Sequence, residues 1–171
     1  MATIKTPVFS TDQIAISKFR KHGRVEYDPH GRLLLTSATG PFNAELIAAL
    51  RELAIITFPN MALLGSWAQC VVFHESAMGG ADVLAGLAEL LKDLVNMGVA
   101  PAATAFVLPP GVEGASIMAP LWELCYKAAN MRFAAFEQSG DAAAWISACL
   151  DAAPAIPGSH ASAPPFDAAS K

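Results

Sequence analysis

Hydrophobic residues along the chain form two kinds of pattern, short unbroken runs and longer stretches with helical spacing. Three of the runs predict strands, and the first two are expected to be buried, since an apolar run without alternation is typical of a strand that is covered on both faces. These runs are residues 68–73, 104–108 and 131–136. The clearest helical stretch follows the first run and ends at Gly98, since glycine favours the left-handed conformation that closes a helix. Its apolar face consists of Leu84, Leu87, Leu91 and Leu94.

A hairpin is expected ahead of these elements. Two runs rich in Val, Leu, Tyr and Thr flank the turn sequence DPHG at residues 28–31, where proline presets one turn dihedral and glycine permits a positive one. Pro41 stops the second strand, and Asn43 then caps a helix through its side-chain oxygen. A loop around residues 58–60 is expected to end this helix. Its apolar face consists of Leu46, Leu50 and Leu53.

Two further helices are predicted in the second half of the chain. The segment 112–130 has helical apolar spacing, and Pro120 either kinks this helix or lies in its first turn, because proline lacks the N–H that a helix interior uses. The apolar positions of this segment are Ile117, Leu121, Leu124 and Ala128. The sequence SGD at residues 139–141 begins a last helix. The helix carries Trp145, Ile146 and Cys149.

The order of these elements predicts an α/β fold. Strands that are separated by helices need crossover connections, so the sheet is expected to be mixed and mainly parallel, with four to five strands, an N-terminal hairpin and about four helices. We divide the chain into an N-terminal segment (1–23), an α/β domain (24–151) and a tail rich in Ala, Pro and Ser (152–171). The tail has too little contiguous apolar surface to pack alone.

Composition narrows the classes of function. Of the 171 residues 54% are hydrophobic, and only 15% are charged where about 25% is typical, so the chain is expected to bury surface in a partner as well as in its core. The net charge of -4 disfavours binding to nucleic acid or to an anionic membrane. The expected partners are therefore a protein, a second copy of the chain or a small ligand.

The cysteines and histidines point to neither a metal site nor a cofactor. Cys70, Cys125 and Cys149 are far apart within apolar patterns, as expected of core thiols in the reducing cytoplasm. The N-terminus lacks the continuous apolar region of a signal peptide, which agrees with a cytoplasmic location. No metal-binding pair of the H-x-H or H-E-x-x-H type occurs in the sequence. Its histidines are His22, His30, His74 and His160.

The element order resembles a known family. A hairpin ending in GPFN (residues 40–43), the strand AQCVVF, a leucine-rich helix ending at Gly98, the strand ATAFVL and the closing sequence RFAAFEQSGDAAAWI are similar to a STAS-like domain of the SpoIIAA-like type, found in small bacterial proteins. In the family, a strand ending in phenylalanine precedes an acidic or polar turn and an Ala-Trp pair. The matching residues are Phe136, Asp141, Ala144 and Trp145. The resemblance implies a non-enzymatic domain that binds protein partners or small ligands in a regulatory role.

One position departs from the family pattern. Many members begin the second helix with Asp-Ser-Ser-Gly or Asp-Ser-Thr-Gly, and the first hydroxyl residue accepts a phosphate. The resemblance aligns that residue with Ala81, the aspartate with Gly80 and the second hydroxyl with Asp82. Alanine cannot be phosphorylated, although Asp82 keeps a negative charge near a helix N-terminus, where the helix dipole favours it.

The sequence HES at residues 74–76 raises an enzymatic alternative, a small α/β hydrolase that uses His74 and Ser76 at the strand ends. A nucleophile elbow needs glycine two places before and after the serine, and these places hold His74 and Met78. A histidine two residues away along an extended chain also does not normally contact the serine. We therefore favour a polar strand end that is followed by a glycine turn.

The same junction is a candidate site for a ligand or partner. Gly79 and Gly80 could expose backbone amides to an anion, but no lysine follows in P-loop order, and Asp82 would repel phosphate. Asn43 is expected at the same sheet edge, because the carboxyl ends of parallel strands lie together. The candidate residues are Asn43, His74, Glu75, Ser76, Gly79, Gly80 and Asp82.

Residues 56–67 (ITFPNMALLGSW) are unusually apolar for a connection between a helix and a strand. They either cover one end of the core or form a contact surface for a homodimer or another partner, for which aromatic residues and methionine are typical. The candidate interface residues are Phe58, Met61, Leu63, Leu64 and Trp67.

Overall fold

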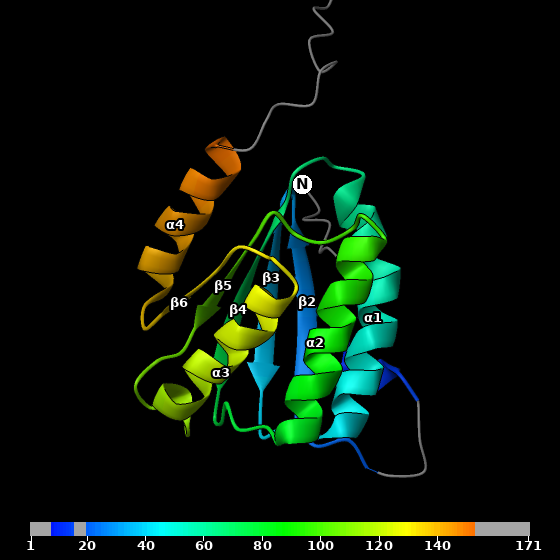
Figure 1. The fold of residues 1–171 in the computed structure, drawn as a ribbon, viewed down its shortest axis with the longest axis vertical. Coiled ribbons are helices and arrows are strands. Elements are labelled where there is room, and N and C mark those ends of the chain that lie inside the picture. Colours follow the sequence, from blue (N-terminus) through cyan, green and yellow to red (C-terminus); the bar gives the residue numbers. More distant parts are fainter. Residues whose placement is uncertain (1–7, 16–19, 153–171) are drawn as a thin grey trace, which may run out of the picture.

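The computed structural model describes residues 8–15 and 20–152, which form one six-stranded sheet flanked by helices (Figure 1). The strands are β1 (Phe9–Ser10), β2 (Arg24–His30), β3 (Leu33–Thr39), β4 (Ala68–His74), β5 (Ala103–Val107) and β6 (Phe133–Phe136). The helices are α1 (Ala44–Ala62), α2 (Ala81–Asn96), α3 (Ala115–Ala128) and α4 (Ser139–Asp151), with a short 3-10 helix η1 (Thr11–Gln13). The expected tail from residue 153 onward lies outside the described residues.

The strands lie in the sheet in the order in which they occur in the chain. β1, β2 and β3 pair antiparallel, and β3, β4, β5 and β6 pair parallel. The expected mixed, mainly parallel sheet with an N-terminal hairpin is confirmed, but it has six strands rather than four to five. The additional edge strand comes from the expected N-terminal segment, where Phe9 pairs with Tyr27 and Ser10 with Glu26.

Two helical layers cover the sheet unequally. The crossover helices α1, α2 and α3 pack on one face, where most of the large buried side chains lie (Figure 1). The helix α4 packs on the opposite face over β4, β5 and β6, where Ile146 and Cys149 contact Cys70 and small residues of β4 and β5. β4 and β5 are therefore covered on both sides, which explains why their sequences show no alternation.

The hairpin turn lies later than expected. β2 continues through Pro29 to His30, and the connection to β3 is Gly31-Arg32, with a φ of 57° at Gly31. Pro29 is tolerated because β1 pairs only as far as Tyr27, so β2 is an edge strand at Pro29.

The helix α1 does not end at residues 58–60 but continues to Ala62, with Pro59 inside it. A proline at this position removes one backbone hydrogen bond of the helix. Burial offsets that loss, because Phe58 and Met61 are buried on the inner side and the Phe58 ring lies 4.8 Å from the ring of Trp67. Most of the expected loop is thus helix.

The helix α3 extends over Ala115–Ala128, and Pro120 lies inside it, beyond the first turn. Its buried face differs from the apolar positions that the sequence emphasised. The buried residues are Met118, Trp122, Cys125 and Tyr126, whereas Ile117, Leu121 and Leu124 are exposed. Each exposed residue directly precedes a buried one, so the apolar surface of α3 is wider than the part that the sheet covers.

The loops at the carboxyl edge of the sheet are held together by their backbones. Phe42 N–H donates to Met78 O over 2.9 Å, and Ala77 N–H donates to Glu113 O over 2.8 Å. Gly40 approaches the second loop so closely that a Cβ there would lie 2.2 Å from Ser76 O. This edge is consequently a close-packed junction of three connections, which follow β3, β4 and β5.

We expect Gly40→Ala to lower the free energy of unfolding by about 1–3 kcal/mol, because the added methyl group meets backbone that cannot rotate away. Gly111→Ala is the control, since no atom lies within 4 Å of a Cβ built there, and it should change stability by less than about 0.5 kcal/mol. Urea unfolding of both variants measures the difference. Equal stabilities would show that the close approach at Gly40 is not a constraint.

None of the helices in the described ranges combines the length and hydrophobicity needed to cross a membrane.

Candidate functional site

The sequence HES ends β4 in a tight turn. His74 is exposed, whereas Ser76 is buried and its Oγ accepts a hydrogen bond from Met78 N–H over 3.2 Å. The backbone N–H of Ser76 donates to His74 O over 2.7 Å, but within the described ranges no hydrogen bond joins the two side chains. The serine hydroxyl is therefore used to form the turn, in the way that short polar side chains commonly bond to the backbone two residues on.

Glu75 occupies the left-handed region of backbone conformation, with a φ of 60°. Its carbonyl accepts a hydrogen bond from Glu113 N–H over 2.8 Å, which ties the connection after β4 to the connection after β5. The Glu75 side chain is exposed. The unusual conformation thus serves the junction between the two loops.

The glycine turn also has a packing role. A Cβ at Gly79 would lie 2.8 Å from a methyl group of Val83 and 3.2 Å from the Trp122 ring. At the start of α2, the Asp82 carboxylate accepts a hydrogen bond from Val83 N–H over 2.9 Å. An anion that approached this helix terminus would meet a carboxylate there, so the arrangement does not favour phosphate.

Asn43 lies at the same edge as the glycine turn, since the adjacent Phe42 bridges to Gly79. Its Oδ1 accepts hydrogen bonds from Leu46 N–H, as a helix cap, and from His22 N–H over 3.0 Å. Its Nδ2 donates to Arg20 O over 3.1 Å. The expected cap is confirmed, and the side chain also fastens the segment before β2 to the helix. A ligand would have to displace these bonds.

The apolar segment 56–67 divides into two groups. Phe58, Met61 and Trp67 are buried and close one end of the core. Leu63 and Leu64 are exposed, with 84% and 54% of their surface accessible, just beyond the end of α1. Of the five candidate interface residues, only these two leucines are therefore available for contact with a partner; Ile56, at the start of the segment, is exposed as well.

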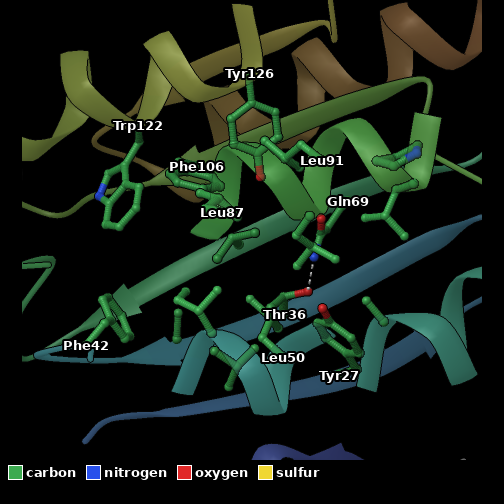
Figure 2. A pocket seen from close by; sticks show the side chains of 18 of the residues that line it. Tyr27, Thr36, Phe42, Leu50, Gln69, Leu87, Leu91, Phe106, Trp122 and Tyr126 are labelled. Carbon is green, nitrogen blue, oxygen red and sulfur yellow. Dashed lines mark hydrogen bonds between the residues drawn. The ribbon is translucent and has the colours of Figure 1, made fainter. Parts of the chain in front are cut away.

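A cavity of about 80 Å³ lies between the sheet and the helices α1, α2 and α3 (Figure 2). This cavity was not among the sites that the sequence patterns predicted. Its wall is mainly apolar, and the side chains come from the strands β2, β3, β4 and β5 and from the three helices on this face. Representative residues are Phe73 in β4, Phe106 in β5, Leu50 in α1, Leu87 and Leu91 in α2 and Trp122 in α3.

Gln69 is the one residue in this wall that has a side-chain amide. It is the second residue of β4, is buried, and faces the cavity side of the sheet. Its Nε2 donates to Thr36 Oγ1 over 3.0 Å, and Figure 2 shows its oxygen pointing away from Thr36, toward the α2 side. Burial of an amide costs free energy unless the amide is hydrogen bonded. Packing alone therefore does not explain a glutamine in a central strand.

Gln69 belongs to a buried polar row that crosses the sheet. Tyr27 on β2 pairs with Thr36 on β3, Thr36 bonds to Gln69 on β4, and Gln69 pairs with Thr104 on β5. Tyr126 of α3 also contributes to the cavity wall. Each of these four strands carries one of these buried polar residues. The sequence shows the residues, but only the register of the strands shows that they lie side by side.

Burial raises the pKa of Tyr27 and of Tyr126 well above the usual value of 10.0. Both hydroxyl groups are consequently neutral at physiological pH and can donate or accept a hydrogen bond. Together with the Gln69 amide they give the cavity neutral polar groups. Such a wall suits an uncharged ligand.

Aromatic rings form the other end of the cavity. The Phe42 ring lies 6.4 Å from the Trp122 ring, and the Phe106 ring lies 5.5 Å from the Tyr126 ring, both nearly edge to face. Trp122 Nε1 is buried without an acceptor in the described part of the chain, and Figure 2 shows it on the side away from Gln69. The polar contacts of the cavity are thus concentrated around Gln69.

Over the described ranges, no three His, Cys, Asp or Glu side chains come close enough together to hold a metal ion. Comparison of the chain with protein-family models, with curated proteins and with solved structures finds no match.

The raised tyrosine pKa values predict a loss of stability in alkali. Below pH 10 both hydroxyls are protonated in the folded and the unfolded chain, so this contribution to stability is fully present. Above pH 10 the unfolded chain releases protons that the folded chain retains, and each tyrosine lowers the free energy of unfolding by up to about 1.4 kcal/mol per pH unit.

Urea unfolding between pH 8 and 11.5, on the order of three pH units, measures this slope. Tyr27→Phe and Tyr126→Phe should each remove about half of the tyrosine contribution to it, and contributions that are common to every variant cancel in the comparison. Slopes that are the same in the wild type and in both variants would contradict the burial of neutral hydroxyl groups beside the cavity.

Proposed function

We propose that this protein is a non-enzymatic binding module of the STAS-like type, and that its ligand site is the cavity between the sheet and α1, α2 and α3. The ligand is compact, uncharged and mainly apolar, and it carries one hydrogen-bonding group that contacts Gln69. The carrying observation is this single amide in a central strand, which faces a mainly apolar cavity whose other polar groups are hydroxyls.

The hydrogen bonds of Gln69 support a role in binding. The amide has two donors and one acceptor oxygen; Nε2 donates to Thr36 and also lies within hydrogen-bond reach of the Tyr27 hydroxyl, which leaves the oxygen for a ligand. A leucine at this position would pack in β4 without any cost of burying a polar group. A ligand that pairs with the remaining amide capacity gives the glutamine a function that the fold alone does not require.

The size of the cavity limits the ligand. A cavity of about 150 Å³ lined by apolar side chains holds benzene, and the cavity here, about 80 Å³, is near half that volume. Molecules of about four non-hydrogen atoms fit without rearrangement. A larger ligand requires α1 and α2 to separate, and the ion pair between Arg51 and Asp93 joins these two helices.

The topology supports the STAS-like part of the proposal. Four consecutive parallel strands lie in sequential order, their three crossover helices share one face, and a hairpin precedes them. The resemblance to the SpoIIAA-like type implies a sheet of four or five strands with its helices mainly on one side, and the shared face of α1, α2 and α3 agrees with the second of these features. Fold resemblance does not by itself assign a function, so the cavity carries the functional argument.

The hydrolase alternative has less support from the geometry. It requires Ser76 to be an accessible nucleophile with a nearby base, whereas the buried hydroxyl accepts a hydrogen bond from the backbone and His74 is exposed. We therefore prefer binding to catalysis as the function of the chain.

Titration with 2-propanol and with xenon, followed by amide NMR shifts, tests the proposal. Both probes should shift amides around the cavity, including those of Val71 and Leu87. Gln69→Leu should weaken binding of 2-propanol about fivefold, the value of one neutral hydrogen bond, and should leave xenon binding unchanged.

Ala54→Leu is the matched control, because Ala54 is a buried residue of the cavity wall and the larger side chain fills the space. It should abolish the binding of both probes in a protein whose circular dichroism is unchanged. Shifts confined to surface amides, or equal binding of 2-propanol by the wild type and Gln69→Leu, would refute the proposal.

A further inference from the structure

Polar groups line the cavity on two opposite sides. Tyr27, Thr36 and Gln69 belong to the sheet, whereas Tyr126 belongs to α3, which packs over it. Figure 2 shows the Tyr126 oxygen at the end of the ring that points from α3 toward the sheet. Burial raises the pKa of Tyr27, and Tyr126 adds to that rise, which places the two hydroxyls in one polar region. A ligand in the cavity therefore meets polar atoms from the sheet and from the helix layer.

The Tyr126 hydroxyl lies close to the Gln69 amide. Thr104 is the register neighbour of Gln69 on β5, and neighbouring strands are about 4.8 Å apart. Burial raises the pKa of Tyr126, and the adjacent Thr104 side chain partly offsets this rise, so the Tyr126 hydroxyl lies beside Thr104. One small polar group between Gln69 and Tyr126 can consequently contact both.

The hydrogen-bonding capacity that remains at this point consists of one acceptor and one donor. The Nε2 group of Gln69 is directed at Thr36 and Tyr27, which leaves the amide oxygen, and this atom can only accept. In the part of the chain that the structure describes, no donor bonds to this oxygen. The neutral Tyr126 hydroxyl can donate. A group that satisfies both residues must donate one hydrogen bond and accept another.

We propose that the polar group of the ligand is a hydroxyl, so that the ligand is a small aliphatic alcohol, and that Tyr126 determines specificity together with Gln69. The ligand O–H donates to the Gln69 oxygen, and the same ligand oxygen accepts a hydrogen bond from the Tyr126 hydroxyl. A ketone, an ether or a nitrile of the same size has only acceptors. Each would leave the Gln69 oxygen buried and unpaired, which costs binding free energy.

The apolar wall favours an alcohol over a water molecule. Water has the same donors and acceptors as a hydroxyl, but it leaves the side chains of Leu87, Phe106 and Trp122 without contacts. An alcohol of about four non-hydrogen atoms fills this space with its carbon atoms and keeps its oxygen between Gln69 and Tyr126. This inference rests on the ligand site proposed above and adds the chemistry of the ligand's polar group.

A comparison of 2-propanol with acetone tests the hydroxyl. The two molecules have the same number of non-hydrogen atoms, and only 2-propanol can donate a hydrogen bond. In titrations followed by the amide NMR shifts of the cavity residues, the wild type should bind 2-propanol at least about fivefold more tightly than acetone. In Gln69→Leu this ratio should fall to about one, because no buried acceptor remains to distinguish the two probes.

Tyr126→Phe tests the second contact. The variant removes a donor that both probes use, so it should weaken 2-propanol and acetone alike, by about fivefold, and leave their ratio as in the wild type. Xenon forms no hydrogen bonds, and its unchanged binding serves as the control that the cavity keeps its size. Circular dichroism checks the fold of the variant.

The outcomes separate this inference from the proposed ligand site. If xenon and 2-propanol both enter the cavity but acetone binds as tightly as 2-propanol, the site stands and the assignment of a hydroxyl is overturned. Unchanged 2-propanol affinity in Tyr126→Phe would overturn the role of Tyr126. If neither 2-propanol nor xenon shifts the amides of the cavity, the site and this inference fall together.

Discussion

The burial of β4 on both faces is the constraint on which the rest of the structure depends. The helices α1, α2 and α3 cover one side of this strand and α4 covers the other, so its side chains are buried from Ala68 to Val71 and again at Phe73. On the face toward α4, the strand carries Cys70 and small residues, which pack against this helix. Toward the cavity the same strand carries Gln69, whose amide must find its hydrogen bonds inside the protein. The cost of burying that group is what distinguishes the cavity from an ordinary packing gap.

Much of the fold could be predicted from the sequence, because local patterns report local structure. The cap at Asn43, the start of α2 after Gly80 and the apolar runs of β4 and β5 all lie where expected. The pattern was less informative where tertiary packing outweighs local preference. Pro59 is an example, since the burial of Phe58 and Met61 continues α1 through it.

The candidate site was not predictable in the same way. Gln69 and Thr36 are separated by 33 residues, and their bond depends on the register of β3 with β4. The residues that the sequence did emphasise, around His74, have side chains or backbones committed to turns and caps. On α3, the helical spacing of apolar residues predicted the helix. It did not show which of two adjacent apolar faces packs against the sheet.

The most direct test of the ligand site is a crystal structure of the protein purified from its own or a closely related host without denaturation. The account predicts electron density for a molecule other than water in the cavity, with a polar atom about 2.7–3.2 Å from the Gln69 amide. A cavity that has closed around Gln69, or that contains only water, would contradict it.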